Sequence, residues 1–229
     1  AQKIGEPQRA FRAYERVLAA DPKNERAARA LIAIYENDQK WPRLPALLEV
    51  VLAALPAGPD APTSAVVERL ATLARLRDLS LGELREPDRG FHWALEAYRV
   101  APEDEAVRAG LEMAAERAGA WEQLAEAYAV RIAQAAGGAS SQDEVRALRR
   151  RVAKFAETKL GKPEVAIKQL RALVDADAAD GEAVAALERI LRAEGRHADL
   201  RALLLSRIEH TSDTTERYVV LGELAKLEE

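Results

Sequence analysis

The sequence predicts an all-α protein made of repeated helical units, and three observations support that prediction. Aromatic residues make up only 5% of the 229-residue chain while apolar residues reach 48%, a balance that favours closely packed helices over a sheet. Apolar residues recur at helical spacing, as at Leu200, Leu203, Leu204 and Ile208, which gives a helix one buried face. A motif also returns at long intervals, and such a period is typical of a repeat architecture.

Three copies of one motif define the repeat. Each copy combines a short loop, a proline in the first helical turn, and a small residue followed by a large apolar one; the copies lie at residues 5–11, 85–91 and 161–167. Further landmarks follow each proline at constant distances of 24, 34 and 37 residues, so the copies keep register. The landmarks are Pro7, Pro87 and Pro163, then Leu31, Leu111 and Leu187, then Trp41, Trp121 and His197, and finally Leu44, Leu124 and Leu200.

One segment of the repeat varies in length, because the prolines are first 80 and then 76 residues apart. The variable segment is the stretch rich in turn formers at residues 56–64, 137–141 and 210–214. The chain therefore divides into super-repeats at about residues 1–80, 81–156 and 157–229, which together form one helical array over residues 1–229.

Each super-repeat is expected to contain four helices, which in the first copy lie at about residues 7–20, 24–38, 42–54 and 65–82. Proline suits the first position of the first helix, because the N–H that it lacks would have no partner there. An aspartate stands near the start of each second helix, and glycine stands where two of these helices should end. These residues are Asp21, Asp104 and Asp180 at the starts, and Gly119 and Gly195 at the ends.

These helices resemble tetratricopeptide repeats. The spacing of that family's second helix recurs three times, without the aromatic residue in the second copy and with Ala178 in place of the closing proline in the third; a further helix matches the family's first-helix positions. The resemblance covers nearly the whole chain, in alternating better and poorer copies, and is strongest to long arrays of GC-rich bacteria; other right-handed α-solenoids, including the half-repeats of RNA-processing scaffolds, share such a periodicity. The matching residues are Ala10, Tyr14, Val17 and Pro22; Gly90, Ala94, Ala97 and Pro102; Ala166, Leu170 and Leu173; and Ala27, Leu31 and Tyr35.

The resemblance implies a right-handed α-α superhelix of about six helical hairpins, whose first helices line a concave wall that binds a peptide segment or a partner domain. The mixed charge of the wall argues against a purely acidic or purely basic ligand. Family members that clamp a C-terminal carboxylate use an asparagine that is absent here, since that position reads Ala33, Met113 and Arg189. The implied groove residues are Arg26, Arg29, Glu36, Asn37, Met113, Glu116, Arg117, Glu182, Arg189 and Arg192.

The three histidines do not indicate a metal or catalytic site. His197 stands at the register of Trp41 and Trp121, so all three are expected to be packing residues. His92 and His210 lack a second histidine or carboxylate at a repeated ligand spacing, so neither zinc binding nor general-base chemistry is indicated. The chain has no cysteine, which excludes thiolate chemistry. We therefore expect no metal, no cofactor and no enzymatic activity.

Nucleic-acid binding is also disfavoured. The formal net charge is -4 with both signs interspersed, which argues against a broad polyanion-binding surface. The glycines at 137 and 138 lack the Lys-Ser or Lys-Thr of a phosphate-binding loop. One basic cluster stands out, but no aromatic residues interleave it and its members fall on different helix faces, so a solvated surface is favoured. The cluster is Arg146, Arg149, Arg150 and Arg151.

The sequence therefore predicts a non-catalytic protein-interaction scaffold. Two alternatives stay open: an RNA-associated helical scaffold, and a regulatory or substrate-holding arm of an enzyme encoded in flanking sequence. The longest apolar run, residues 44–55, is too short for a membrane span. The chain begins at Ala1 and ends at the same phase of the repeat, so we expect a piece of a longer cytoplasmic protein whose apolar end faces favour end-to-end self-association.

Overall fold

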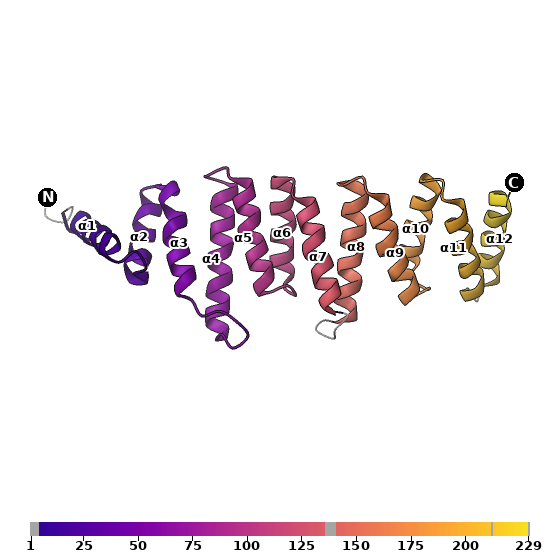
Figure 1. Ribbon diagram of the computed structural model, residues 1–229, viewed down its shortest axis with the longest axis horizontal. Coiled ribbons are helices and arrows are strands. Elements are labelled where there is room, and N and C mark those ends of the chain that lie inside the picture. Colours follow the sequence, from indigo (N-terminus) through magenta and orange to yellow (C-terminus); the bar gives the residue numbers. More distant parts are fainter. Residues whose placement is uncertain (1–4, 136–140, 212, 229) are drawn as a thin grey trace. The chain divides into compact units, whose positions relative to one another are not determined.

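The structure is a computed structural model that describes residues 5–135, 141–211 and 213–228. Within these ranges the protein is all-α, with twelve α-helices, one short 3₁₀-helix and no strand. The helices form two compact units, Ala1–Ala120 and Trp121–Glu229, and within each unit every helix packs against the next (Figure 1). The predicted fold class is confirmed, and the twelve helices correspond to the six helical pairs expected.

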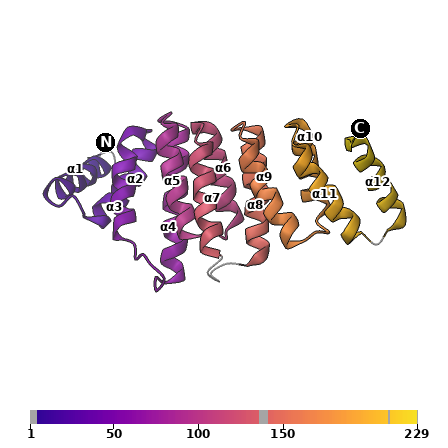
Figure 2. The ribbon, with the colours of Figure 1, turned by 45° about the vertical axis from the view of Figure 1, so that its right-hand side comes forward.

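The first unit contains six α-helices that follow one another in chain order (Figures 1 and 2). Their bounds lie within two residues of the predicted ones for the first super-repeat. The structure adds a 3₁₀ turn, η1, ahead of α3. The helices are α1 (Gly5–Ala20), α2 (Glu25–Asn37), η1 (Trp41–Arg43), α3 (Leu44–Ala54), α4 (Thr63–Leu81), α5 (Pro87–Val100) and α6 (Glu105–Ala118).

The second unit contains six further helices, which also follow one another in chain order. Pro163 begins α9 just as Pro87 begins α5, which confirms the predicted role of proline at the start of the first helix of a super-repeat. The variable loops precede α4, α8 and α12; residues 137–140 of the second loop and residue 212 of the third lie outside the described residues. The helices are α7 (Trp121–Ala135), α8 (Gln142–Thr158), α9 (Pro163–Ala176), α10 (Gly181–Ala193), α11 (His197–His210) and α12 (Thr214–Glu228).

The leucine landmarks form the core of both units. Each of the six predicted leucines is at most 2% exposed, so the register read from the sequence places the same residue in the same buried position three times. Burying a leucine side chain stabilises the folded state by about 1.5–3 kcal/mol, which makes these positions the framework of the repeat. They are Leu31, Leu111 and Leu187 in the second helices and Leu44, Leu124 and Leu200 in the third.

Three sequence predictions need correction. Pro7 is the third residue of α1 rather than its first; a proline is tolerated there because the first four helical N–H groups have no intrahelical partner. His197 is exposed, whereas Trp41 and Trp121 at the same register are half-buried, since the smaller imidazole at the start of α11 does not reach the core. The third variable segment begins one residue later than predicted, because His210 is the last residue of α11.

The start of α2 also differs from the prediction. Its N-cap is Asn24, whose side chain accepts a hydrogen bond from the Ala27 N–H at 3.0 Å. Asp21 instead accepts a hydrogen bond from the Lys23 N–H at 3.2 Å and so shapes the preceding turn. In the other two copies the predicted Asp104 and Asp180 are the N-caps.

Ion pairs join alternate helices within each unit, so the helices form two layers. In the first unit we call α2, α4 and α6 the even layer and α3 and α5 the odd layer; in the second unit, taken by itself, α8, α10 and α12 form the even layer and α7, α9 and α11 the odd layer. The even-layer pairs are Arg29–Glu68, Glu36–Arg75, Arg189–Glu157 and Arg192–Glu223, and the odd-layer pairs are Arg89–Glu49, Lys162–Glu122, Arg171–Asp199 and Arg196–Glu164.

Candidate partner-binding grooves

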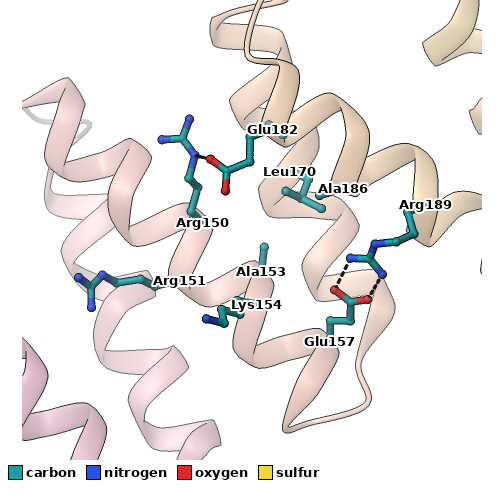
Figure 3. Close-up of a pocket in the computed structure, with 10 residues that line it drawn as sticks. Arg150, Arg151, Ala153, Lys154, Glu157, Leu170, Glu182, Ala186 and Arg189 are labelled. Carbon is teal, nitrogen blue, oxygen red and sulfur yellow. Dashed lines mark hydrogen bonds and ion pairs between the residues drawn. The ribbon is translucent and has the colours of Figure 1, made fainter.

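The α8–α10 groove opens between two even-layer helices over the helix that connects them. It has a volume of about 290 Å³, and its floor comes from Ala153 of α8, Leu170 of α9 and Ala186 of α10 (Figure 3). Ala153 and Leu170 are each 4% exposed. The alanine methyl groups are too short to fill the space between α8 and α10, so the sequence itself leaves this surface hollow.

Charged side chains border this groove at both ends (Figure 3). At one end, Arg150 donates a hydrogen bond to Asp180 at 2.5 Å and lies 3.7 Å from the carboxylate of Glu182. At the other end, Arg189 binds Glu157 through two hydrogen bonds, one of them at 2.9 Å. These pairs connect α8 to α10 and fix the width of the groove.

The electrostatics of the Glu157–Arg189 pair follow from this contact. The hydrogen bond that Arg189 donates lowers the pKa of Glu157 below its ordinary value, and the opposite charge of Arg189 acts in the same direction. The same hydrogen bond raises the pKa of Arg189. Both groups therefore stay charged at neutral pH, which suits a groove rim that has to keep a fixed charge pattern.

The α2–α4 groove of the first unit has the same construction. It lies between α2, α3 and α4 with a volume of about 380 Å³, and its floor includes Ile32, Leu48 and Val51. Arg29 pairs with Glu68 of α4 at 2.6 Å. Its rim is balanced, with two arginines and two glutamates, namely Arg29, Arg75, Glu36 and Glu68.

Four of the ten groove residues implied by the sequence line these two grooves, namely Arg29, Glu36, Glu182 and Arg189. Arg192 lies outside them and pairs with Glu188 at 2.5 Å and with Glu223 of α12 at 3.2 Å. The other five are exposed residues of the even layer outside both grooves: Arg26 and Asn37 on α2, and Met113, Glu116 and Arg117 on α6.

Sequence reasoning missed the opposite wall of each groove. It took residues only from the second helix of each super-repeat, whereas α4 and α8, which are fourth helices, supply the other wall. Ala71 and Ala153 could have indicated these walls in the sequence, because a small side chain on a helix face leaves the surface hollow at that place. The missed lining residues are Glu68 and Arg75 of α4, and Arg150, Arg151, Lys154 and Glu157 of α8.

The basic cluster of α8 is engaged within the protein. Arg149 donates a hydrogen bond to Gln169 of α9 at 2.9 Å, while Arg150 turns to Asp180 and Glu182. Arg149 and Arg150 thus contact different neighbours, as their helical spacing predicts. Arg149 lies apart from Arg150 and Arg151, which line the α8–α10 groove, so the cluster is divided, unlike the continuous basic surface that follows a nucleic-acid backbone.

Other chemistry gains no support from the described parts of the chain. In residues 5–135, 141–211 and 213–228, no three His, Asp or Glu side chains come close enough together to hold a metal ion. His92 packs edge-on against Trp93 with ring centroids 4.7 Å apart, and the Nδ1 of His210 lies 2.8 Å from the Ser206 carbonyl oxygen. No helix among the described residues combines the length and apolarity that a membrane crossing requires.

Comparison with known proteins finds similarity among solved structures. The chain is similar to a tetratricopeptide repeat protein from Parabacteroides merdae, with 13% identity and a TM-score of 0.35 over 100% of this chain and 80% of that one. It is similar to BtubC (BKLC) from P. vanneervenii, with 13% identity and a TM-score of 0.34 over 99% and 86% of the two chains. No family model and no curated protein matches the sequence.

Proposed function

We propose that this chain is a non-catalytic interaction scaffold that binds a segment of another protein in its even layer, with the α8–α10 groove as the principal site. The observation that carries the proposal is the combination of a hollow apolar floor with a charged rim at that groove. An apolar floor supplies affinity by burying side chains of the ligand, and a charged rim selects among ligands.

The charge of the rim favours an acidic segment. Four cationic side chains line the α8–α10 groove against two lining carboxylates, Glu157 and Glu182, and the Asp180 carboxylate that pairs with Arg150 at its edge, which leaves an excess of one positive charge in a chain whose net charge is -4. The α2–α4 groove has no such excess. We therefore infer that the α8–α10 groove binds a peptide segment bearing both carboxylates and apolar side chains, a narrower ligand than the mixed charge of the ten sequence-implied residues suggested. The cations are Arg150, Arg151, Lys154 and Arg189.

Lys154 offers a direct test of this proposal. It is exposed and lines the groove, so Lys154→Glu reverses a charge at the site without disturbing the core. Lys168→Glu is the matched control, because Lys168 is an exposed lysine on α9, in the odd layer. A random-peptide display library selected on the wild-type protein provides the probe, and binding of the selected peptides is then measured by titration.

We expect selected peptides to be rich in Asp and Glu, and Lys154→Glu to weaken their binding about tenfold, which corresponds to roughly 1.4 kcal/mol. Lys168→Glu should leave binding unchanged. Equal weakening by both variants would mean a non-specific charge effect. Binding that survives Lys154→Glu but is lost on deletion of residues 57–62 would place the ligand on the α3–α4 loop instead and refute the proposal.

A further inference from the structure

Helices α4, α5 and α6 of the first unit follow the same register as α8, α9 and α10 of the second, so each residue corresponds to the one 76 positions later. The turns between the helices repeat as well. After α4 the Glu86 N–H donates to the Ser80 carbonyl oxygen at 2.7 Å, and after α8 the Lys162 N–H donates to the Ala156 carbonyl oxygen at 2.8 Å. The α8–α10 groove can therefore be compared, residue by residue, with the space between α4 and α6.

Between α4 and α6, this space holds the side chain of Arg77. Its guanidinium lies directly on Gly110 of α6, because a Cβ atom placed on Gly110 would overlap Nη1 of Arg77 and lie 3.2 Å from its Cζ. The Arg77 side chain is only 17% exposed, and its Nε donates a hydrogen bond to the Asp78 carboxylate at 2.7 Å. A long side chain thus reaches from α4 to α6, and a glycine makes room for it.

The α8–α10 groove is the same place without that side chain. Arg77 corresponds to Ala153 and Gly110 to Ala186, and both alanines line the groove (Figure 3). Two methyl groups stand where the first unit has a whole arginine side chain, and a volume of about 290 Å³ is left between the helices. Because protein interiors are closely packed, an apolar hollow at a position that is filled in the other copy favours a side chain that comes from a ligand.

The charges around the groove exclude a second arginine as the inserted side chain. Asp78, which holds the guanidinium of Arg77, corresponds to Lys154. A cation inserted between α8 and α10 would therefore meet a positive charge at the place where Arg77 meets a carboxylate, and like charges disfavour such a ligand. The floor of the groove is apolar, so burying a charged group on it is unfavourable as well. A long uncharged side chain satisfies both conditions.

We propose that the α8–α10 groove binds its peptide segment through one long apolar side chain, of the size of leucine, methionine or phenylalanine, which inserts between Ala153 and Ala186. The acidic residues of the segment lie beside this anchor, at the cationic rim. The inference rests on the proposed function and specifies which residue of the ligand supplies most of the affinity, as a buried anchor does in many interfaces.

The first unit supplies the design of variants that fill the groove. Ala153→Arg combined with Ala186→Gly introduces the residues that stand at these positions between α4 and α6, and Ala153→Met fills the hollow without adding a charge. Ala186→Gly alone is the matched control, because it changes the floor without filling the groove. Binding of the acidic peptides selected from the display library is titrated for each variant, and circular dichroism with urea unfolding shows that each variant is folded.

We expect the double variant and Ala153→Met each to weaken peptide binding about tenfold or more, and Ala186→Gly to change it by less than about threefold. The double variant separates volume from charge. Its arginine adds a positive charge to the rim, which by attraction alone would strengthen the binding of an acidic peptide, so only the filled volume explains a loss. Alanine substitution along the peptide should find one large apolar position that matters in the wild type and has little further effect in Ala153→Met.

Peptides that Lys154→Glu weakens, but that bind the double variant and Ala153→Met as tightly as the wild type, would overturn this inference and leave the proposed function intact. An equal loss in Ala186→Gly alone would also overturn it, because the effect would then come from α10 itself. Loss of binding in the filled variants without any effect of Lys154→Glu would support the inserted side chain and refute the role of the cationic rim. A library that yields no binding peptide would refute both.

Discussion

Two positions of the repeat hold the backbone in the left-handed region, where a residue with a Cβ atom is strained. After the second helix, Gly119 and Gly195 have φ angles of 66° and 65°, but Gln39 stands at the same register with a φ of 55°. Before the first helix, Gly161 has a φ of 59° while Arg85 has a φ of 55°. A non-glycine residue costs about 1–2 kcal/mol in this conformation, so the strain differs among the three copies.

Replacing each strained residue with the glycine of its counterparts should therefore stabilise the protein. We expect Gln39→Gly and Arg85→Gly each to raise the free energy of unfolding by about 0.5–1 kcal/mol. This gain is the backbone strain that is relieved, minus the entropy cost of the more flexible glycine in the unfolded chain. Both side chains are exposed, so no packing is lost. The midpoint of urea unfolding, followed by circular dichroism, measures the effect. Gln39→Ala keeps the Cβ atom and should give no gain; lower midpoints for both glycine variants would contradict this account.

At the scale of the helix, the capping residue of α2 shows where sequence reasoning succeeds and where it fails. The capping position lies 17 residues after the proline in every copy and is occupied by Asn24, Asp104 or Asp180. A search for aspartate finds two of these and selects Asp21 in the first copy. Register is thus the better guide than residue type, because asparagine caps a helix as well as aspartate does.

Substitutions of Asn24 and Asp21 test which of the two residues caps α2. Asn24→Ala removes the side-chain oxygen that accepts from the Ala27 N–H and should cost about 1 kcal/mol, whereas Asn24→Asp should be tolerated. Asp21→Ala should cost less, since it removes hydrogen bonds of an exposed turn. Thermal unfolding of the three variants measures the order of stability. If Asp21→Ala proves the more damaging substitution, Asn24 is not the residue that fixes the start of α2.

The link between α8 and α10 is expected to weaken in acid. Arg189 lowers the pKa of Glu157 in the folded protein, whereas the unfolded chain titrates near the ordinary glutamate value of about 4.3. Because the pKa of Glu157 is lower in the folded than in the unfolded state, the ion pair stabilises the folded protein fully at pH values above the unfolded pKa. This stabilisation disappears as the pH falls through the folded pKa. The effect is small, because the two side chains are 31% and 59% exposed and solvent screens their attraction.

The comparison of wild type with Glu157→Gln isolates this contribution. The wild type should unfold at the higher urea concentration at pH 7, and the difference should shrink progressively as the pH falls below the ordinary glutamate value of about 4.3, and should also shrink in 1 M salt. Glu209→Gln, at an exposed position of α11, provides the control and should show no comparable pH dependence. A difference between wild type and Glu157→Gln that changes neither with falling pH nor with added salt would mean that the ion pair is not its source.

The grooves show the limit of sequence reasoning at the level of several helices. The periodic apolar pattern locates each helix and its buried face, because burial depends on side chains within one helix. A groove requires the distance between two helices that are not adjacent in sequence. Alanine at Ala153 and Ala186 and the ion pair of Arg189 with Glu157 together set that distance, and no single helix contains this information.

At the scale of the whole molecule, the division into two compact units does not follow the sequence repeat. The predicted boundaries near residues 80 and 156 each fall inside a unit, whereas the units meet at Ala120 and Trp121. Similarity between the copies defines the length of the repeat. It does not indicate at which point of the repeat neighbouring helices make few contacts. The single array over residues 1–229 remains a prediction.

The packing of each helix on its successor has a mechanical consequence. In a globular domain, strands and helices distant in sequence lock one another, so a pulling force must break many contacts together. In each unit here, a helix is held mainly by its neighbours along the chain, and tension applied at the two ends of a unit meets the interfaces one after another. The unit therefore unfolds one helix interface at a time, beginning at the weakest interface. When the load is released, the helices pack again in the same stepwise manner.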